Sequence, residues 1–368
     1  MIIETKLGKK TISEIWQVPM AIQKSVFQKQ NRALIREISR GIISSGCVSI
    51  YIFGSGTSYH AGLVSTYWFS QLAKFPTHCE LAPEFPYLIE PIIAPKHVAI
   101  CISQSGESEL TVYSAQKSKD KGAHVIAITN NESSTITKIA GHRTLVTQAG
   151  PEESILATKT YISELAVLAA LAIDLAFLRK KISDDEYNSI WDEFKTVPKL
   201  IELTLPLFHK EIRTIAPFFK FSRNCFVIGA GPDYANCMEA ALKLKEGARI
   251  FSQAFSTAET PHGPITLLSD PRDAFVLCII PRPEAESRHK DIVKLISRLK
   301  KRGVTILGIK NPIDDTLDLD IAIDIPKCSE IFHPLFSIIP VQLLVVEIAT
   351  IQNIDCDRPK DLSKISSL

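Results

Sequence analysis

The sequence predicts an α/β protein with two tandem, doubly wound parallel sheets, flanking helices and a C-terminal tail. The first observation is a set of short apolar runs that alternate with helix-like segments, such as HVAICIS (97–103) and AHVIAIT (123–129). Runs that are apolar without interruption are typical of parallel strands that helices cover on both faces. The second observation is that this pattern occurs twice in the 368-residue chain, a length that favours two domains.

Each half begins with a strand-like run, a glycine-rich turn and a helical pattern. The first is SIYIF (49–53) followed by GSGTSYHAG, and the second is CFVI (225–228) followed by GAGPDYANC. Residues that correspond at one fixed offset are Gly54 with Gly229, Gly56 with Gly231, and Tyr59 with Tyr234. Two later runs recur as well, HVAICIS as AFVLCIIP (274–281) and AHVIAIT as GVTILGI (303–309).

We expect five segments along the chain. They are N-terminal lead-in helices at 1–40, a first α/β domain at 41–184, a helical connector at 185–220, a second α/β domain at 221–354 and a C-terminal tail or lid at 355–368. Within the lead-in segment, one helix is predicted over Ile12–Ile35.

Composition narrows the class of protein. The formal net charge is +2 with 22% charged residues, which gives no electrostatic reason to expect nucleic acid or a membrane surface as a partner. The eight cysteines form no CxxC pair, and several lie inside apolar runs. We therefore expect reduced, buried cysteines rather than a disulfide framework or a metal site.

Two long apolar stretches raise the question of a membrane. Ile162–Leu178 contains Glu164, and Pro334–Ala349 contains Glu347, so neither is an unbroken apolar span of about 20 residues. Both are predicted to be buried core helices. The N-terminal MIIETKLGKK lacks a secretory apolar core, and a cytoplasmic location is expected.

Hydroxyl groups gather at the predicted carboxyl edge of the first sheet. The loop Ser103–Ser108 (SQSGES) follows a core strand, and Thr57 and Ser58 follow its neighbour. Ligands of open parallel sheets bind outside the carboxyl ends of the strands, and hydroxyls with helix-start amides suit a phosphate monoester. The alternative is ordinary helix capping by one of these serines, which accounts for a single hydroxyl. The equivalent loop of the second half, Pro281–Glu284, lacks the hydroxyls.

The turn GSGTSY resembles the start of a dinucleotide fingerprint, but Tyr59 stands where the third glycine belongs. We expect no nicotinamide or flavin cofactor, and no other cofactor.

Candidate groups for proton transfer lie in the second half. Glu239, Lys243 and Glu246 share one face of the helix that follows Tyr234. A solvated salt-bridge stripe is the plain interpretation of such spacing. His262 lies between two prolines in ETPHGP, and it is either a structural loop histidine or a rigidly held acid or base. A carboxylate, an ammonium and an imidazole near a phosphate site would suit proton transfer beside a sugar carbonyl.

Nearly the whole chain resembles the sugar isomerase (SIS) domain family. The blocks that carry the resemblance are SEIWQVPMAIQKSV, GSGTSYHAGLVSTYWF, SQSGESELT, AGPEESILATKTY, EAALKLKEGARIFSQAFSTAETPHGPI and DRPKDLSKISSL. They are similar to the isomerase half of glucosamine-6-phosphate synthases and to stand-alone SIS-type glucosamine-6-phosphate deaminases. The resemblance implies two flavodoxin-like SIS domains that bind a hexose 6-phosphate or an amino sugar 6-phosphate.

The resemblance also assigns roles to residues. The positions implied for phosphate and sugar binding are Thr57, Ser58, Ser103, Gln104, Ser105, Ser108, Ile155 and Ala157. Glu246 matches the base that moves the proton between C1 and C2, with Lys243 and Glu239 as its neighbours on the helix. His262 matches the histidine that opens the sugar ring and reaches a neighbouring subunit's site, which implies a homodimer. Lys364 matches the tail lysine that meets the ketose carbonyl.

The chain departs from the family pattern in three ways. Ala157 replaces a serine, Ser108 replaces a threonine, and a glutamine-hydrolysing domain with its N-terminal cysteine is missing. We therefore expect breakdown of glucosamine 6-phosphate to fructose 6-phosphate and ammonia. The open alternatives are a deglycase of sugar–amino acid 6-phosphates, a plain aldose–ketose isomerase, a synthase subunit that receives ammonia from a partner, and a non-catalytic sugar phosphate sensor.

Overall fold

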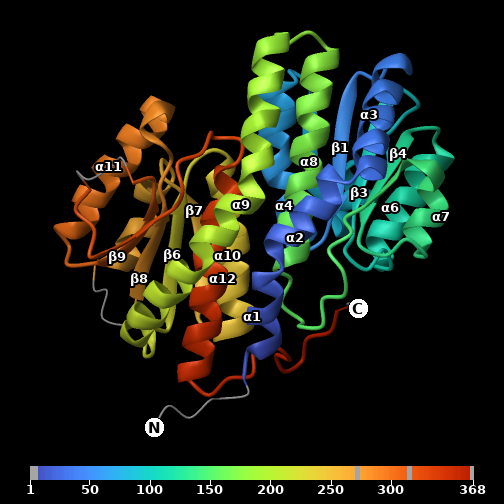
Figure 1. Cartoon of the computed structure of the whole chain (residues 1–368). Helices are drawn as coiled ribbons and strands as arrows, with labels where there is room; N and C mark the ends of the chain where they lie inside the picture. Colours follow the sequence, from blue (N-terminus) through green and yellow to red (C-terminus); the bar gives the residue numbers. More distant parts are fainter. Residues whose placement is uncertain (1–6, 270–273, 313–316, 365–368) are drawn as a thin grey trace. The chain divides into compact units, whose positions relative to one another are not determined.

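The computed structural model describes residues 7–269, 274–312 and 317–364, which fold into two compact α/β units (Figure 1). The first-sheet unit comprises Gln17–Glu152, Ala157–Pro198 and Leu362–Leu368, and the second-sheet unit comprises Met1–Trp16, Glu153–Leu156 and Lys199–Asp361. Parts of the expected lead-in helices, second domain and tail (residues 1–6, 270–273, 313–316 and 365–368) lie outside the described residues.

Both units contain a five-stranded sheet with the same strand order. The first sheet has the order β2-β1-β3-β4-β5, and the second has β7-β6-β8-β9-β10. All neighbouring strands are parallel. The strands are β1 (Ser49–Gly54), β2 (Thr77–Leu81), β3 (His97–Ile102), β4 (His124–Thr129), β5 (Thr144–Val146), β6 (Asn224–Gly229), β7 (Phe251–Ser256), β8 (Ala274–Ile279), β9 (Thr305–Lys310) and β10 (Ile321–Asp324). This order belongs to the flavodoxin-like doubly wound class, so the predicted fold class is confirmed.

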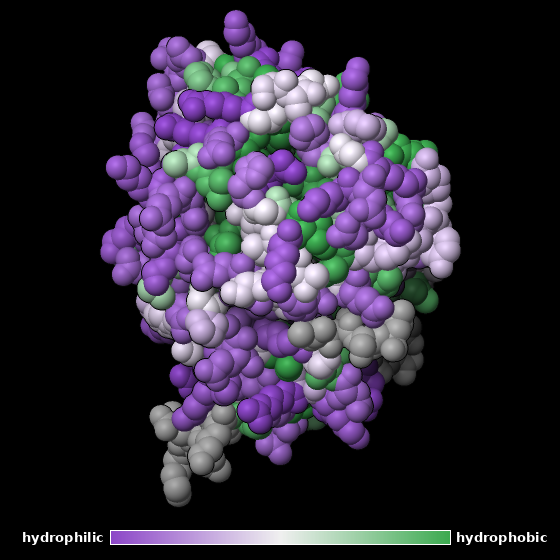
Figure 2. Space-filling view, turned by 90° about the vertical axis from the view of Figure 1, so that its right-hand side faces the viewer, coloured by the Kyte–Doolittle hydropathy of each residue, from purple (hydrophilic) through white to green (hydrophobic). Residues whose placement is uncertain are grey.

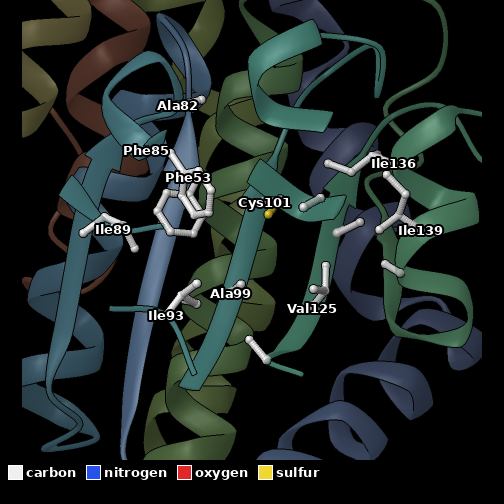
Figure 3. Packing of buried hydrophobic residues seen from close by; sticks show 14 residues of the cluster. Phe53, Ala82, Phe85, Ile89, Ile93, Ala99, Cys101, Val125, Ile136 and Ile139 are labelled. Carbon is white, nitrogen blue, oxygen red and sulfur yellow. The ribbon is translucent and has the colours of Figure 1, made fainter. Parts of the chain in front are cut away.

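Helices cover both faces of the first sheet. Helices α4 (Thr57–Tyr67) and α8 (Lys159–Leu178) pack on one face, and α6 (Glu109–Asp120) and α7 (Thr135–Ala140) pack on the other (Figure 1). Figure 3 shows the core under α6 and α7, where Ala99 and Cys101 of β3 lie among larger apolar side chains. Successive strand residues point to opposite faces, so the intervening residues of β3 are buried under α4 and α8. The short pieces of this unit include η2 (Trp68–Leu72), η3 (Ala82–Glu84), α5 (Phe85–Leu88) and η4 (Gly141–Arg143).

The second sheet is covered in the same way. Helices α10 (Pro232–Ala248) and α12 (His333–Ile351) pack together and lie on one face. Helix α11 (Glu286–Lys300) buries Ile292 and Leu299 against Ile228 and Val276 on the other. The remaining short pieces are η5 (Ala216–Phe219), η6 (Thr260–His262), η7 (Pro264–Leu268) and η8 (Pro283–Ala285). The connector is helix α9 (Asp184–Ile215), and the boundary between the units falls within it, after Pro198.

The single lead-in helix predicted over Ile12–Ile35 is wrong. The segment forms α1 (Lys9–Trp16), α2 (Val18–Ile22), a π-helical turn η1 (Gln23–Phe27) and α3 (Lys29–Ser44). Pro19 lies in the first turn of α2, where its missing N–H and fixed φ are tolerated, and so marks a new helix start. Gln28 has an extended backbone (φ −60°, ψ 134°), which separates η1 from α3.

Helices α8 and α12 are both long and apolar enough to cross a membrane by length and composition alone. Most of each helix is buried inside the protein, as in core helices of folded domains, so this composition is weak evidence for a membrane span. Figure 2 shows that hydrophilic side chains cover most of the face in view, with smaller hydrophobic areas between them.

The contact of α10 with α12 gives a stability test. A Cβ atom on Gly247 would lie 2.3 Å from Val345 Cγ1 and 2.9 Å from Leu156 Cδ2, so Gly247→Ala should overpack this core and lower the free energy of unfolding by about 1–3 kcal/mol. Gly41 in α3 has open space around it, and Gly41→Ala should raise that free energy by about 0.5–1 kcal/mol. Urea unfolding measures both changes. A shift in the same direction for the two variants would contradict the packing described for Gly247.

Candidate active site

A cluster of serine hydroxyls lies at the carboxyl end of β3. Ser103 Oγ is 3.0 Å from Ser108 Oγ and 3.5 Å from Ser105 Oγ. Two backbone amides also point at these oxygens, because Gly106 N donates to Ser103 Oγ (3.1 Å) and Glu107 N donates to Ser105 Oγ (3.2 Å). The structure thus brings together three of the hydroxyls that the sequence singled out.

Ordinary capping does not explain Ser108. It occupies the N-cap position of α6, but its hydroxyl forms no capping bond to the backbone of that helix. The hydroxyl instead contacts Ser103 Oγ. An N-cap side chain normally satisfies an amide of the first turn, so amides at the start of α6 remain available to a ligand.

The loop that carries the cluster has little freedom. Gly106 has φ +70°, and a Cβ atom there would lie 2.1 Å from Ser134 Oγ and 2.9 Å from Thr129 Oγ1, so only glycine fits. The backbone oxygen of Gln104 accepts a hydrogen bond from Asn130 N at 3.0 Å. The hydroxyls and the half-buried side chain of Gln104 are therefore held in position before any ligand arrives.

Thr57 and Ser58 form the first turn of α4, beside the glycine-rich turn after β1. Ser58 is buried, and its hydroxyl donates to Glu164 Oε1 at 3.0 Å. The sequence interpretation did not include Glu164. The available signal was an acidic residue in an otherwise apolar stretch of α8. Because Ser58 donates its proton to Glu164, its oxygen is left as an acceptor toward any ligand.

A second missed carboxylate, Glu152, organises the loop that contains Ala157. Its buried oxygens accept hydrogen bonds from Thr158 N (2.8 Å), Thr158 Oγ1 (3.3 Å), Thr160 N (3.3 Å) and Thr160 Oγ1 (2.6 Å). Lys364 Nζ lies 3.2 Å from Glu152 Oε2. The predicted tail lysine is therefore anchored to a carboxylate within the first-sheet unit. The pair of acidic residues in AGPEES (149–154) was the signal that could have identified Glu152.

Ile155 belongs to the second-sheet unit. Its backbone N donates to Asp357 O at 2.9 Å, and the Asp357 carboxylate accepts from Thr11 N (2.9 Å) and Thr11 Oγ1 (2.7 Å). These bonds attach the Ile155 segment and the first part of the tail to helix α1.

The charged face of α10 is a compact triad. Lys243 Nζ lies 2.6 Å from Glu246 Oε2 and 3.4 Å from Glu239 Oε1. Glu239 and Lys243 are fully buried, whereas the Glu246 side chain is 22% exposed. The interpretation as a solvated salt-bridge stripe is therefore wrong. Two carboxylates share one ammonium, so the triad carries a net negative charge when all three groups are ionised, and Glu246 is the member that solvent or a ligand can reach.

His262 ends the 3-10 turn η6 on the Thr260–His262 segment, and its side chain is exposed. Its backbone N donates to Glu259 O at 2.9 Å. The structure records no hydrogen bond between the imidazole and any described residue, so within the second-sheet unit this ring can accept or donate a proton to another molecule.

The cysteines supply no nucleophile in the described part of the chain. All eight are free and buried, as predicted. Burial raises the pKa of Cys278 and of Cys356 to about 12, so these thiols stay protonated near neutral pH. Across the described ranges, His, Cys, Asp and Glu side chains form no group of three or more that could hold a metal ion.

Glu152 allows a test of the loop and tail anchor. Glu152→Gln should place an amide NH₂ group against the donors Thr160 Oγ1 or Lys364 Nζ, and we expect a loss of about 1–3 kcal/mol in the free energy of unfolding. Hydrogen exchange should accelerate at the amides of Thr158 and Thr160. The control is Glu153→Gln, which weakens an exposed ion pair with Lys10 and should change stability by less than about 1 kcal/mol. Equal effects of the two variants would refute the role given to Glu152.

Comparison with known proteins agrees with this architecture. The SIS domain family matches residues 43–174 and 219–352. A glutamine–fructose-6-phosphate aminotransferase (isomerizing) of Thermococcus kodakarensis is 36% identical over 354 residues, which cover 96% of this chain and 57% of that protein. The chain thus spans little more than half the length of this relative.

Solved structures show the same fold. The C-terminal domain of glucosamine-fructose-6-phosphate aminotransferase from Francisella tularensis has a TM-score of 0.86 at 24% identity and covers 98% of this chain and 100% of that domain. Glucosamine-6-phosphate deaminase from Thermotoga maritima has a TM-score of 0.74 at 22% identity, with 98% and 100% coverage.

The expected family is confirmed, and the chain stands among SIS-family sugar phosphate enzymes. One copy of the domain contains the hydroxyl cluster and the other contains the charged triad. The chain therefore belongs to the SIS domain family, whose model matches it twice.

Proposed function

We propose that this chain is a phosphosugar isomerase that moves a proton between C1 and C2 of glucosamine 6-phosphate and releases fructose 6-phosphate and ammonia. The observation that carries the proposal is the α10 triad, in which the buried Lys243 holds the partly exposed Glu246 while Glu239 shares its charge. A carboxylate that is fixed in place but keeps net negative charge around it suits the task of a general base. Membership of the SIS family supports a sugar phosphate as the substrate.

The phosphate is assigned to the hydroxyl cluster. Ser103, Ser105 and Ser108, with the amides at the start of α6, offer donors to a dianion, and Thr57 begins a second helix whose start also favours negative charge. We assign Ser58, Gln104, Ile155 and Ala157 to the same substrate, as contacts to phosphate or sugar, because their sequence blocks resemble those of the SIS family. No metal ion or redox cofactor is needed in this scheme, because the substrate carbonyl accepts the electron pair.

The reaction proceeds through the open-chain sugar. His262 opens the pyranose ring by moving a proton between the C1 hydroxyl and the ring oxygen. Glu246 then takes the proton from C2, the electron pair moves toward the C1 carbonyl, and the proton returns at C1. The C1 oxygen takes up the proton that the amino nitrogen gives up as it becomes the imine. The product is the 2-imine of fructose 6-phosphate, which one water molecule hydrolyses to fructose 6-phosphate and ammonia. Lys243 and Lys364 would stabilise the developing oxyanion.

We also propose a homodimer in which His262 reaches the active site of a neighbouring subunit, as the resemblance of its PHGP segment to the SIS family implies. The exposed imidazole supports this proposal, because a ring without a described partner in its own chain is available to a second chain. A cytoplasmic location is part of the same proposal.

A second candidate is the reverse, synthetic direction. It is favoured by the 36% identity to an isomerizing aminotransferase. In that case the chain would receive ammonia from a partner that hydrolyses glutamine, and would form glucosamine 6-phosphate from fructose 6-phosphate.

An activity assay distinguishes the two directions. We expect purified protein with millimolar glucosamine 6-phosphate to release fructose 6-phosphate and ammonia in equal amounts. A sugar–amino acid 6-phosphate, and fructose 6-phosphate with ammonium or with glutamine, complete the substrate panel. Turnover only in the synthetic direction would replace the deaminase by the second candidate. Binding of the sugar phosphates without turnover of any of them would identify a sensor and refute the enzyme.

Glu246 gives a sharper test of mechanism. Glu246→Gln keeps the size of the side chain but cannot accept the C2 proton, so kcat should fall by about 10²- to 10⁴-fold while sugar phosphate binding persists. Glu239→Gln should lower kcat less, because it only removes the second negative charge beside Lys243. Lys245→Gln, an exposed neighbour on α10, is the control. Exchange of the C2 hydrogen with deuterated solvent, followed by NMR, measures the step, and unchanged exchange in Glu246→Gln would exclude Glu246 as the base.

A further inference from the structure

A cavity of about 230 Å³ lies in the first-sheet unit, away from the hydroxyl cluster. It is lined by Arg36 and Arg40 of α3, by Asp174, Phe177 and Leu178 at the end of α8, and by Tyr187 near the start of α9. Helix α8 touches Ser58 through Glu164, ten residues before Asp174, and ten helical residues span about 15 Å. The cavity is therefore at the far end of α8 from the proposed substrate site.

The carboxylate that lines the cavity is already neutralised. Asp174 is buried and forms a bidentate pair with Arg32, with Nη1–Oδ2 and Nη2–Oδ1 distances of 2.5 and 2.7 Å. The Tyr187 hydroxyl donates to Asp174 Oδ1 at 2.9 Å. Burial and the nearby Asp174 raise the pKa of Tyr187, so its hydroxyl stays neutral near neutral pH and adds no negative charge.

Two further guanidinium groups face the cavity without a matching charge. Arg36 and Arg40 are one turn apart on α3, and Arg36 hydrogen-bonds the Tyr187 side chain. No carboxylate in the described ranges forms an ion pair with either arginine. Like charges at this spacing repel, and a bound anion would relieve the repulsion. The planar fork of arginine also matches the oxygens of a phosphate group in a bidentate manner.

We propose that this cavity is a second anion site that binds a small phosphate-bearing molecule, separate from the hydroxyl cluster. A volume of about 230 Å³ lies below the roughly 300–1,000 Å³ of ordinary ligand pockets and suits inorganic phosphate or a small phosphomonoester. Phe177 and Leu178 provide an apolar wall for the carbon part of such an ester. The proposal rests on the cavity and its charges, and it does not depend on the reaction assigned to the chain.

The test is a binding measurement on the full chain. We expect equilibrium titration with fructose 6-phosphate to detect two sites per chain, and unphosphorylated fructose to detect none. Arg36→Gln with Arg40→Gln should weaken one site by about tenfold or more and leave the other unchanged, since both substitutions remove charge-assisted donors to the anion. Ser103→Ala with Ser105→Ala should remove the other site instead. Arg298→Gln, an exposed arginine on α11, is the matched control.

Inorganic phosphate distinguishes the possible ligands. Tighter binding of fructose 6-phosphate than of inorganic phosphate at the arginine-dependent site assigns a phosphomonoester, and equal affinities assign the free anion. A single site that the two arginine substitutions leave unchanged would overturn the proposal, even if the chain deaminates glucosamine 6-phosphate normally. If the double variant loses its circular dichroism spectrum, Arg40→Gln alone, an exposed change, should still weaken the second site.

Discussion

Each sheet is buried on both faces, and this constraint determines where polar chemistry can occur. Helices cover β1, β3 and β4 on one side with α4 and α8 and on the other with α6 and α7, so the strands are apolar along their length. Within the sheet itself, polar groups can converge only where the strands end. The hydroxyl cluster of Ser103–Ser108 lies at such an end, and its amides come from the loop that must follow β3. The same constraint makes the loop rigid, because Gly106 packs directly against Ser134 and Thr129.

The two sheets share their strand order but not their edge chemistry. After β3 the first sheet carries three clustered serine hydroxyls, whereas the loop after β8 in the second sheet contains Arg282, which hydrogen-bonds Glu284. The second half places its polar groups on α10 instead, where Lys243 is buried between two carboxylates. The duplicated architecture thus carries two different polar arrangements, a cluster of neutral hydroxyls in one unit and a charged triad in the other.

Buried carboxylates recur as organisers in the first-sheet unit. Glu152 gathers the amides and hydroxyls of Thr158 and Thr160, Glu164 accepts from Ser58, and Asp174 pairs with Arg32. Glu152 and Asp174 accept several hydrogen bonds or an ion pair, as burial of a charge requires, and Glu164 accepts the Ser58 hydroxyl on Oε1. These groups fix loops and helix ends. Because Arg32 already neutralises Asp174, this carboxylate does not compensate the positive charges of Arg36 and Arg40.

The central strands of both sheets could be predicted from the sequence. Uninterrupted apolar runs identified β1, β3, β4, β6, β8 and β9, since a strand buried on both faces can contain little else. The edge strands β2, β5, β7 and β10 were not predicted. Strand β5 has only three residues, and the other three are partly exposed, so polar residues interrupt their apolar runs. The lead-in helix was predicted as one piece although Pro19 signals a helix start, and the second break, at Gln28, leaves no proline or glycine signal.

The sequence by itself determined the doubly wound class, the duplication and the local hydroxyl loop, because strand burial, repeats and adjacent residues are all properties of neighbours along the chain. Only the tertiary structure decided which charged residues are buried and what they contact. Lys243 and its two carboxylates have the spacing of a surface stripe, and packing of α10 alone makes them a buried triad. Arg32 and Asp174 are 142 residues apart, and Lys364 and Glu152 are 212 apart. Pairs at such separations arise from the packing of distant segments, which leaves no local pattern to read.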